Sequence, residues 1–379
     1  MKLQKVIVHG LLGQEGELEI NFNSDLNIIT GRNGAGKTTL MKLIWYIISG
    51  NTLLALKEVK FTRILLQTDL YSCVVHRISK ATCKIEFEQD GQSYLFEDDS
   101  DDDDGNTFSS FAEDKLDEKL KALGSSVFLP TFRRIEGGFT LNASHRSNRL
   151  SAKNEVEEAL VALSKKLTNE PHVFVSAIST VDIVSLLLRQ YTDLSEESNI
   201  FQQEISQKII QIIKSYKTDQ VEKQENSNTS ELQGALKENE GILENIKQLV
   251  ESIEVSREEI MSPLAAITSL VERLFKHAGI KFGQRLNFGD AANAISSDDL
   301  SAGEKQMLSF ICYNAFYKNS VFIIDEPELS LHVDWQRQLF TLLQSQQTGN
   351  QFIIATHSPF IYAKYPDKEI LLNGDRGEE

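Results

Sequence analysis

The feature that most constrains this sequence is a glycine-rich segment, Gly31 to Thr39, which reads GRNGAGKTT and fits the pattern G-x-x-x-x-G-K-[ST]. Ahead of it, the apolar stretch Leu26–Thr30 predicts a short buried strand, and residues 38–48 behind it predict a helix. Glycines allow the backbone N–H groups of such a loop to converge, and the helix N-terminus favours an anion. The segment therefore predicts an α/β fold built around a phosphate-binding loop.

Each polar residue type in this loop suits the binding of a nucleotide. Lys37 places a positive charge near the β- and γ-phosphates, and Thr38 offers a hydroxyl to Mg²⁺. The alternative is a glycine turn beside an unrelated lysine, and the strand and helix on either side argue against it. From this loop, the residues expected to bind ATP are Asn33, Gly34, Ala35, Gly36, Lys37, Thr38 and Thr39.

Length and composition limit the class of protein. The chain has 379 residues, enough for two or three domains, and 41% of them are hydrophobic and 25% charged, as in ordinary globular proteins. It has no apolar run of membrane-spanning length and no signal peptide at the N-terminus, so we expect a cytoplasmic protein. Three cysteines without metal-ligand spacing are expected to be reduced structural thiols: Cys73, Cys83 and Cys312.

Charge is unevenly distributed along the chain. The net charge of −16 argues against a surface that coats DNA globally, but a local basic patch is compatible with it. The acidic run from Glu97 to Asp104 predicts a solvated loop. A basic cluster follows and is the best candidate for a nucleic-acid contact, although it could instead be a solvated loop that balances the acidic run: Arg133, Arg134, His145, Arg146, Arg149 and Lys153.

The pattern of the chain suggests three parts: residues 1–150 as an N-terminal half with a β-subdomain, 151–280 as a helical insertion, and 281–379 as a C-terminal half. Within the insertion, helices are expected over about 180–223 and 231–277, joined by a polar tip. The apolar spacing is not a sustained heptad, so it predicts a short antiparallel arm or bundle and not a long coiled coil.

Three further motifs follow the insertion. Leu300–Gln306 opens a predicted helix, where Ser301 and Glu304 also have the spacing of a simple capping box. The apolar strand Val321–Ile324 ends in Asp325 and Glu326, and such an acidic pair is costly to bury unless it serves a cation or a proton transfer. The strand Gln351–Thr356 should deliver His357 to the same sheet edge.

The order of these motifs resembles the ATP-binding-cassette ATPases, most closely the branch with the chromosome-maintenance and double-strand-break-repair ATPases, the RecF-like proteins and the overcoming-lysogenization-defect ATPases. Gly31–Thr39 resembles the Walker A loop, Leu300–Gln306 the signature, Ile323–Glu326 the Walker B strand, Glu328–His332 the D-loop and His357 the switch histidine. The implied fold is a mixed-sheet ATPase head, with a P-loop core and an antiparallel β-subdomain, that carries an inserted helical arm.

The resemblance also implies the roles of the site residues. The expected cofactors are ATP and Mg²⁺, with Thr38 and Asp325 as metal ligands, Glu326 as the group that activates water, and His357 against the γ-phosphate. The implied catalyst is a head-to-tail homodimer, with assembly above the dimer left open, in which the signature of one copy completes the other copy's ATP site. The signature residues expected to do so are Ser301, Ala302, Gly303 and Glu304.

The sequence departs from this family's pattern twice. Ala302 stands where many members have glycine, and we expect the small alanine to preserve function. The segment that resembles the glutamine loop, Val127–Arg133, has Pro130 and Thr131 in place of an obvious glutamine, and Gln67 is an alternative.

Three functions are compatible with such an ATPase. The first is a sensor or regulator of a partner effector, expected to be a nuclease, in antiphage defence or DNA transactions. Phe128–Glu136 is similar to a segment of ATPases in retron and Septu-type defence systems. Because the chain ends about twenty residues past His357, we expect the nuclease on another chain. The second is a mainly structural role, in which ATP binding clamps an assembly and turnover is slow, as in an ATP clamp of the DNA-repair type. The third, a transporter's nucleotide-binding subunit, is disfavoured because roughly 270 residues separate Walker A from the signature.

Overall fold

The computed structural model describes residues 1–98, 111–131, 159–160, 162–176, 180–223, 241, 243–261 and 301–372. The chain divides into two compact units, one formed by Met1–Ser179 with Leu300–Glu379 and the other by Thr180–Asp299. The boundaries expected at 150 and 280 lie outside the described residues, so the three-part division stays a prediction. The basic cluster and the acidic run after Asp98 lie outside them as well.

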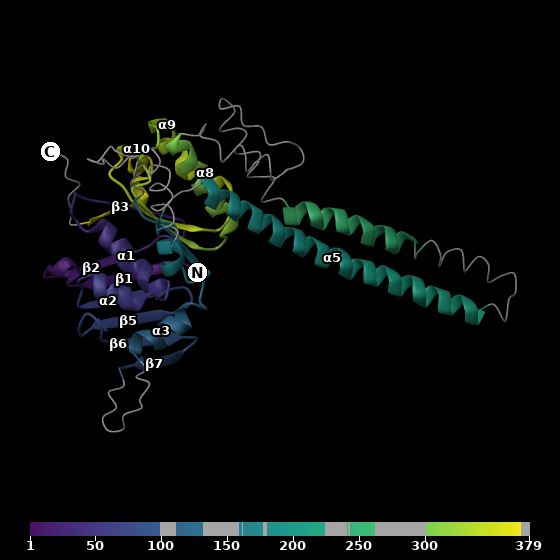
Figure 1. The fold of residues 1–379 in the computed structure, drawn as a ribbon, viewed down its shortest axis with the longest axis horizontal. Coiled ribbons are helices and arrows are strands. Elements are labelled where there is room, and N and C mark those ends of the chain that lie inside the picture. Colours follow the sequence, from purple (N-terminus) through teal and green to yellow (C-terminus); the bar gives the residue numbers. More distant parts are fainter. Residues whose placement is uncertain are drawn as a thin grey trace, which may run out of the picture. The chain divides into compact units, whose positions relative to one another are not determined.

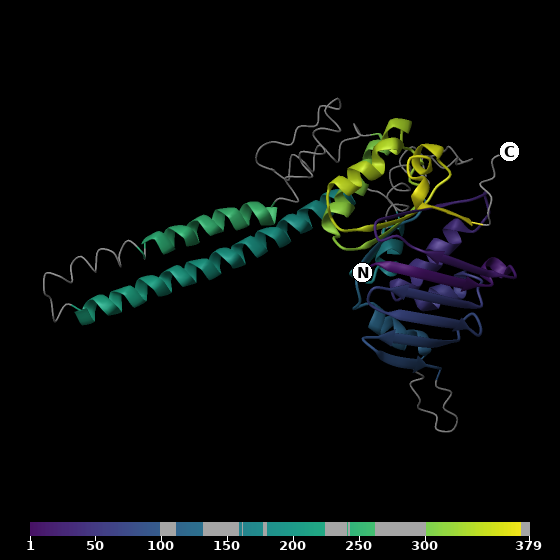
Figure 2. The ribbon, with the colours of Figure 1, turned by 180° about the vertical axis from the view of Figure 1, so that it is seen from behind.

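The first unit contains an antiparallel sheet, as the alternating pattern of residues 57–97 predicts. Its order is β2-β1-β4-β5-β6-β7, and neighbouring strands are antiparallel throughout. Figure 2 shows these strands from behind. The strands are β1 (Leu3–His9), β2 (Glu17–Asn21), β4 (Arg63–Thr68), β5 (Ser72–Arg77), β6 (Cys83–Gln89) and β7 (Gln92–Phe96).

The second sheet of this unit is parallel and has the order β12-β3-β11-β10-β8-β9. Every residue of β3, β8, β10 and β11 is buried, which explains their uninterrupted apolar runs, since a parallel sheet is covered on both faces. The strands are β3 (Leu26–Thr30), β8 (Ser126–Leu129), β9 (His172–Phe174), β10 (Val321–Asp325), β11 (Gln351–Ala355) and β12 (Glu369–Leu371).

A short strand, β9, lies within residues 151–280, for which the sequence predicts a helical insertion. β9 pairs in parallel with β8 and extends the sheet at its edge. With three residues, β9 is too short to produce an alternating signal, so the tertiary contact with β8 determines its conformation.

Helix α1 (Lys37–Ile48) packs in the core that the two sheets share. Its last six residues are all buried, and Trp45 stacks on Phe128 of β8 with ring centroids 5.6 Å apart. α2 (Thr52–Glu58) contacts α1, and α3 (Ala112–Leu120) covers β6 and β7 (Figure 1). Helix α1 thus packs against both α2 and β8 in the core of the first unit.

The C-terminal helices of the first unit are α8 (Ala302–Phe316), α9 (Val333–Ser345) and the short α10 (Pro359–Tyr362), and 3₁₀ turns occur at Leu11–Gly13 and Pro366–Lys368. The predicted capping box is present in α8: Glu304 N–H donates to Ser301 Oγ at 3.3 Å, and Ser301 N–H donates to Glu304 Oε2 at 2.7 Å. All three cysteines are free and buried, as expected.

The second unit contains α5 (Thr180–Lys223), a helix of 44 residues with the bounds that the sequence predicts. Residues 243–261 are also helical, and they run beside α5 in both ribbon views (Figures 1 and 2). The expected tip between the two helices lies outside the described residues. Among the described helices, none is both long and apolar enough to cross a membrane.

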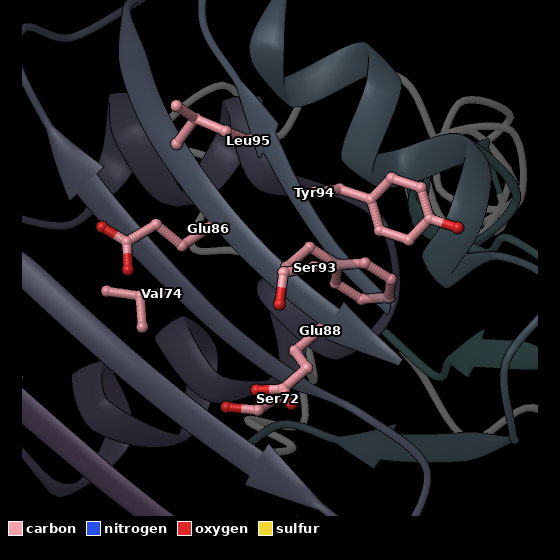
Figure 3. A pocket seen from close by; sticks show the side chains of 8 residues that line it. Ser72, Val74, Glu86, Glu88, Ser93, Tyr94 and Leu95 are labelled. Carbon is pink, nitrogen blue, oxygen red and sulfur yellow. The ribbon is translucent and has the colours of Figure 1, made fainter. Parts of the chain in front are cut away.

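The outer face of the antiparallel sheet has a shallow hollow over β5, β6 and β7 (Figure 3). Glu86 and Glu88 project from β6 on the same face as Ser72, Val74, Ser93 and Leu95. The hollow thus lies on the antiparallel sheet, away from the phosphate-binding loop on the parallel one.

Candidate nucleotide-binding and catalytic site

The candidate site lies at one edge of the parallel sheet, where four neighbouring strands end. The phosphate loop follows β3, and β11, β10 and β8 lie beside it in that order. Because parallel strands present their carboxyl ends at the same edge, segments far apart in sequence meet there, and ligands of open α/β sheets bind at such edges.

Lys37 is held at the centre of this edge. Its ammonium donates to the carbonyl oxygens of Gly31 at 2.9 Å and Arg32 at 3.1 Å, and it contacts Nε2 of His357 at 2.7 Å. Burial lowers the pKa of Lys37, while the carboxylates of Glu326 and Asp325 oppose that shift. The lysine therefore joins the loop after β3 to the residue after β11.

The loop leaves the N-terminus of α1 open to an anion. The residue before the helix is Gly36, with φ of 92°, and no side chain caps the first turn. A side chain at Gly36 would be strained at this φ and would meet Leu12 Cδ1 at 2.9 Å. Two of the loop residues, Asn33 and Gly34, are exposed. Others are half-buried: Ala35, Gly36, Thr38 and Thr39. Uncapped N–H groups beside a lysine form a site for phosphate.

Asp325 ends β10 and is 1% exposed. Thr38 Oγ1 donates to its two carboxylate oxygens at 3.1 and 2.9 Å, and Thr131 Oγ1 donates to Oδ2 at 2.5 Å. Thr131 follows β8 and stands in the segment that resembles the glutamine loop. Gln67, the alternative named above, is on β4 of the antiparallel sheet, opposite Ser72. Of the described residues of this segment, Thr131 is thus the one that contacts the Walker B carboxylate.

Glu326 follows Asp325 and has an unusual backbone conformation. Its φ is 50°, in the left-handed region, and its N–H donates to the carbonyl oxygen of Ala355 at 2.8 Å. Such a conformation costs a non-glycine residue about 1 kcal/mol or more, so the surrounding contacts have to maintain it. Burial, followed by the charges of Asp325 and Glu328, raises the pKa of Glu326. A raised pKa makes the carboxylate a stronger base.

The signature segment contacts the loop that resembles the D-loop. A Cβ added at Gly303 would lie 2.3 Å from the carbonyl oxygen of Ser330, so the helix approaches that loop at a distance that requires glycine. Nearby, Gln306 Nε2 donates to the carbonyl oxygen of Pro327 at 3.2 Å. Among the described residues, the exposed Ser301 hydroxyl makes no bond besides the cap bond that it accepts from Glu304, so its own hydrogen is left to donate.

The oxygen groups around Asp325 suit a small hard cation. Two hydroxyls and a carboxylate converge there, and Mg²⁺ is typically bound by one or two protein oxygens, together with phosphate oxygens and water. Among the described residues, no group of three or more His, Cys, Asp or Glu side chains could hold a metal by itself. The Thr38 hydroxyl and the Asp325 carboxylate fit a metal that is bound together with the phosphates of a nucleotide.

The chain is a P-loop ATPase of mixed α/β fold. Three features define this class: the glycine loop after β3, the buried Asp325 opposite Thr38, and the parallel sheet. The chain belongs to the family described as "AAA domain, putative AbiEii toxin, Type IV TA system", which matches residues 26–363.

A curated relative and two solved structures are similar to parts or all of the chain. Endonuclease GajA of Bacillus cereus (strain VD045) is 32% identical over 141 residues, covering 32% of this chain and 24% of that protein. The Smc head domain of Pyrococcus furiosus, bound to the C-terminal domain of ScpA, aligns with 96% of this chain and 91% of its own at 13% identity and a TM-score of 0.37. A second SmcHead, bound to the C-winged helix domain of ScpA, covers 96% and 92% at 11% identity and a TM-score of 0.38.

Proposed function

We propose that this protein binds ATP with Mg²⁺ and hydrolyses it to ADP and phosphate. The observation that carries the proposal is the convergence of Lys37, Asp325, Glu326 and His357 at the edge of one sheet, next to an uncapped helix N-terminus. Family membership supports the same chemistry.

The residues of the chain divide the work as follows. The loop N–H groups and Lys37 hold the phosphates, and Thr38 and Asp325 would hold the metal. When bound, Mg²⁺ neutralises charge on the β- and γ-phosphates. Glu326, with its raised pKa, orients the attacking water and takes its proton, and His357 contacts the γ-phosphate.

In the structure, Lys37 is bonded to the loop carbonyls and to His357. An arriving γ-phosphate competes for the lysine and releases the imidazole, which can then turn toward the phosphate. Through this exchange, nucleotide binding would change the contact between the loop after β3 and the residue after β11.

We further propose that two copies pair head to tail. The capped N-terminus of α8 has a hydroxyl hydrogen at Ser301, the small Ala302 and the close-packed Gly303, and its Glu304 completes the capping box. An oxygen of a partner's γ-phosphate could accept from Ser301, so that each copy would complete the site of the other.

In the cell, we propose that the ATPase regulates a partner effector, a nuclease in trans, in antiphage defence. Similarity to an endonuclease over part of its length supports this role, but the chain spans only 24% of that protein. A second candidate, a DNA-repair clamp, is favoured by the 44-residue helix α5, because a rigid arm of this length suits a clamp. The proposed nucleic-acid contact through Arg133, Arg134, Arg146 and Arg149 stays a prediction.

The biochemical test compares wild type with Glu326→Gln and Lys37→Ala. Phosphate release by Glu326→Gln should fall by about 10²-fold or more, because the general base is lost while ATP binding is retained. Light scattering with ATP and Mg²⁺ should then show a dimer of Glu326→Gln and a monomer of Lys37→Ala. A wild-type protein that releases no phosphate above the Lys37→Ala background would disprove the ATPase proposal.

The cellular test expresses the gene with its natural neighbours and measures phage plating. Lys37→Ala in the same cassette is the matched control. Defence predicts that the wild-type cassette lowers plating efficiency and the variant does not. Equal plating with both cassettes, together with greater sensitivity to DNA-damaging agents in the variant, would favour the repair clamp.

A further inference from the structure

The turn that carries His357 is tied to the turn after Glu326 by a side chain with no role so far. Glu328 Oε1 accepts the backbone N–H of His357 at 2.8 Å, across 29 residues of sequence. Glu328 lies three residues beyond Asp325 and belongs to the loop that resembles the D-loop. Its carboxylate therefore connects the segments after β10 and β11 directly.

A second side chain holds the other end of the same turn. Gln336 on α9 accepts from Ser358 Oγ at 2.6 Å and donates to the carbonyl oxygen of Leu331 at 2.8 Å. The residue after His357 is thus bonded through α9 to the loop that contains Glu328. Between these two contacts, the backbone of His357 has little freedom to rotate.

The carboxylate of Glu328 is held at a cost. Its second oxygen, Oε2, is buried and has no hydrogen-bond partner among the described residues. Its charge also acts on Lys37 and Glu326, because it opposes the lowering of the lysine pKa and contributes to the raising of the glutamate pKa. Glu328 as a residue is half-buried, but a carboxylate oxygen that is shielded from water without a partner is unfavourable for the fold by itself, which points to a role in the site.

We propose that Glu328 is a positioning residue: its Oε1 fixes the backbone of His357 so that the imidazole Nε2 faces Lys37 and, after exchange, the γ-phosphate. The proposal rests on the ATPase function proposed above. Glu328 contacts neither the nucleotide nor the water, and acts through the geometry of His357.

Two variants separate position from charge. Glu328→Gln keeps an acceptor oxygen at the same reach and removes the charge, while Glu328→Asp keeps the charge and withdraws the oxygen by one methylene. The proposal predicts that Glu328→Asp lowers kcat by between about tenfold and a hundredfold with KM for ATP changed less than about twofold, since a misplacement of about 1 Å costs up to 10²-fold. Glu328→Gln should recover most of the rate. The exposed Glu88→Ala on β6 is a control for loss of a glutamate elsewhere.

A double-mutant cycle tests whether Glu328 acts through His357. His357→Ala alone sets the rate without the imidazole, and Glu328→Asp/His357→Ala should be no slower than His357→Ala. Additive losses of rate in the double variant would overturn the proposal. Full activity of Glu328→Asp together with a loss of activity in Glu328→Gln would also overturn it, because that result would assign the effect to the charge of Glu328.

A readout independent of turnover distinguishes failure of this proposal from failure of the ATPase proposal. The chain has seven histidines, and ¹⁵N-imidazole NMR of nucleotide-free protein can assign His357 by comparison with His357→Ala. Because a protonated lysine can only donate, Nε2 of His357 should be the unprotonated acceptor. Glu328→Asp should shift only the His357 resonances, and Glu328→Gln should restore them. Unshifted resonances in a folded Glu328→Asp protein would overturn the proposal even if wild type proved unable to hydrolyse ATP.

Discussion

Replacement of Gly303 by alanine tests the close approach of α8 to the loop after β10. Gly303 has no positive φ, so the backbone conformation itself accepts alanine. The obstacle is the carbonyl oxygen of Ser330, 2.3 Å from the added Cβ, whereas real Cβ atoms stay beyond 3.0 Å. One of the two backbones must therefore move by at least about 0.7 Å, and Gly303 is buried in the first turn of α8, whereas Ser330 is exposed.

The size of the effect follows from two opposing terms. Alanine in place of glycine favours a helix by up to about 1 kcal/mol, and less at the first turn. Overpacking against backbone typically costs about 1–3 kcal/mol. We therefore expect Gly303→Ala to lower the free energy of unfolding by about 1–2 kcal/mol, which lowers the melting temperature of a unit this size by a few degrees.

The assay is thermal unfolding followed by circular dichroism, with Gly241→Ala as the matched control. Gly241 is also helical without positive φ, but no atom of the described part of the chain lies within 4 Å of its added Cβ. Gly241→Ala should thus leave the melting temperature unchanged or raise it slightly. If Gly303→Ala were as stable as Gly241→Ala, the inferred close packing of α8 against Ser330 would be wrong.

Two further predictions concern buried carboxylates. Thr131→Val removes one of the hydroxyls that donate to Asp325, so the Mg²⁺ concentration for half-maximal ATP hydrolysis should rise about tenfold. The control variant Gln67→Ala should leave that concentration unchanged. Equal effects of the two variants would show that Thr131 does not belong to the metal site. Burial raises the pKa of Asp117 to about 6 from 3.8, despite the hydrogen bonds from Thr52. Because the folded protein holds this proton more tightly than the unfolded chain, protonated Asp117 contributes stability fully below pH 3.8, and the contribution is lost as the pH rises through 6. The loss amounts to about 3 kcal/mol of unfolding free energy. Denaturant titrations at several pH values should therefore show that Asp117→Asn gains stability relative to wild type between pH 4 and 7, and a constant difference would contradict the raised pKa.

Much of the fold could be predicted because its signals are clear. The short apolar runs that became β3, β10 and β11 favour buried strands, and the pattern of α5 extends over 44 residues. The three-residue strands β9 and β12 could not be predicted, because they exist only through their pairing with β8 and β3.

The same limit applies to the candidate site. Lys37 and Asp325 stand in motifs whose residue spacing predicts their chemistry, whereas no local motif predicts a role for Thr131. Its contact with Asp325 spans 194 residues of sequence, and only the order of strands in the sheet brings the two together. The contact of Glu328 with the backbone of His357 was likewise hidden, because a backbone donor leaves no trace in the pattern of side chains.

The order of the parallel sheet has a consequence during synthesis on the ribosome. The strand that leads into the phosphate loop, β3, is made early, but its two neighbours, β11 and β12, come last in sequence among the described strands and so emerge much later. Until then both of its edges lack the partners that they have in the finished sheet. A nascent chain that stalls before residue 351 should therefore be a preferred client of chaperones, and should gain the ability to retain nucleotide only after release.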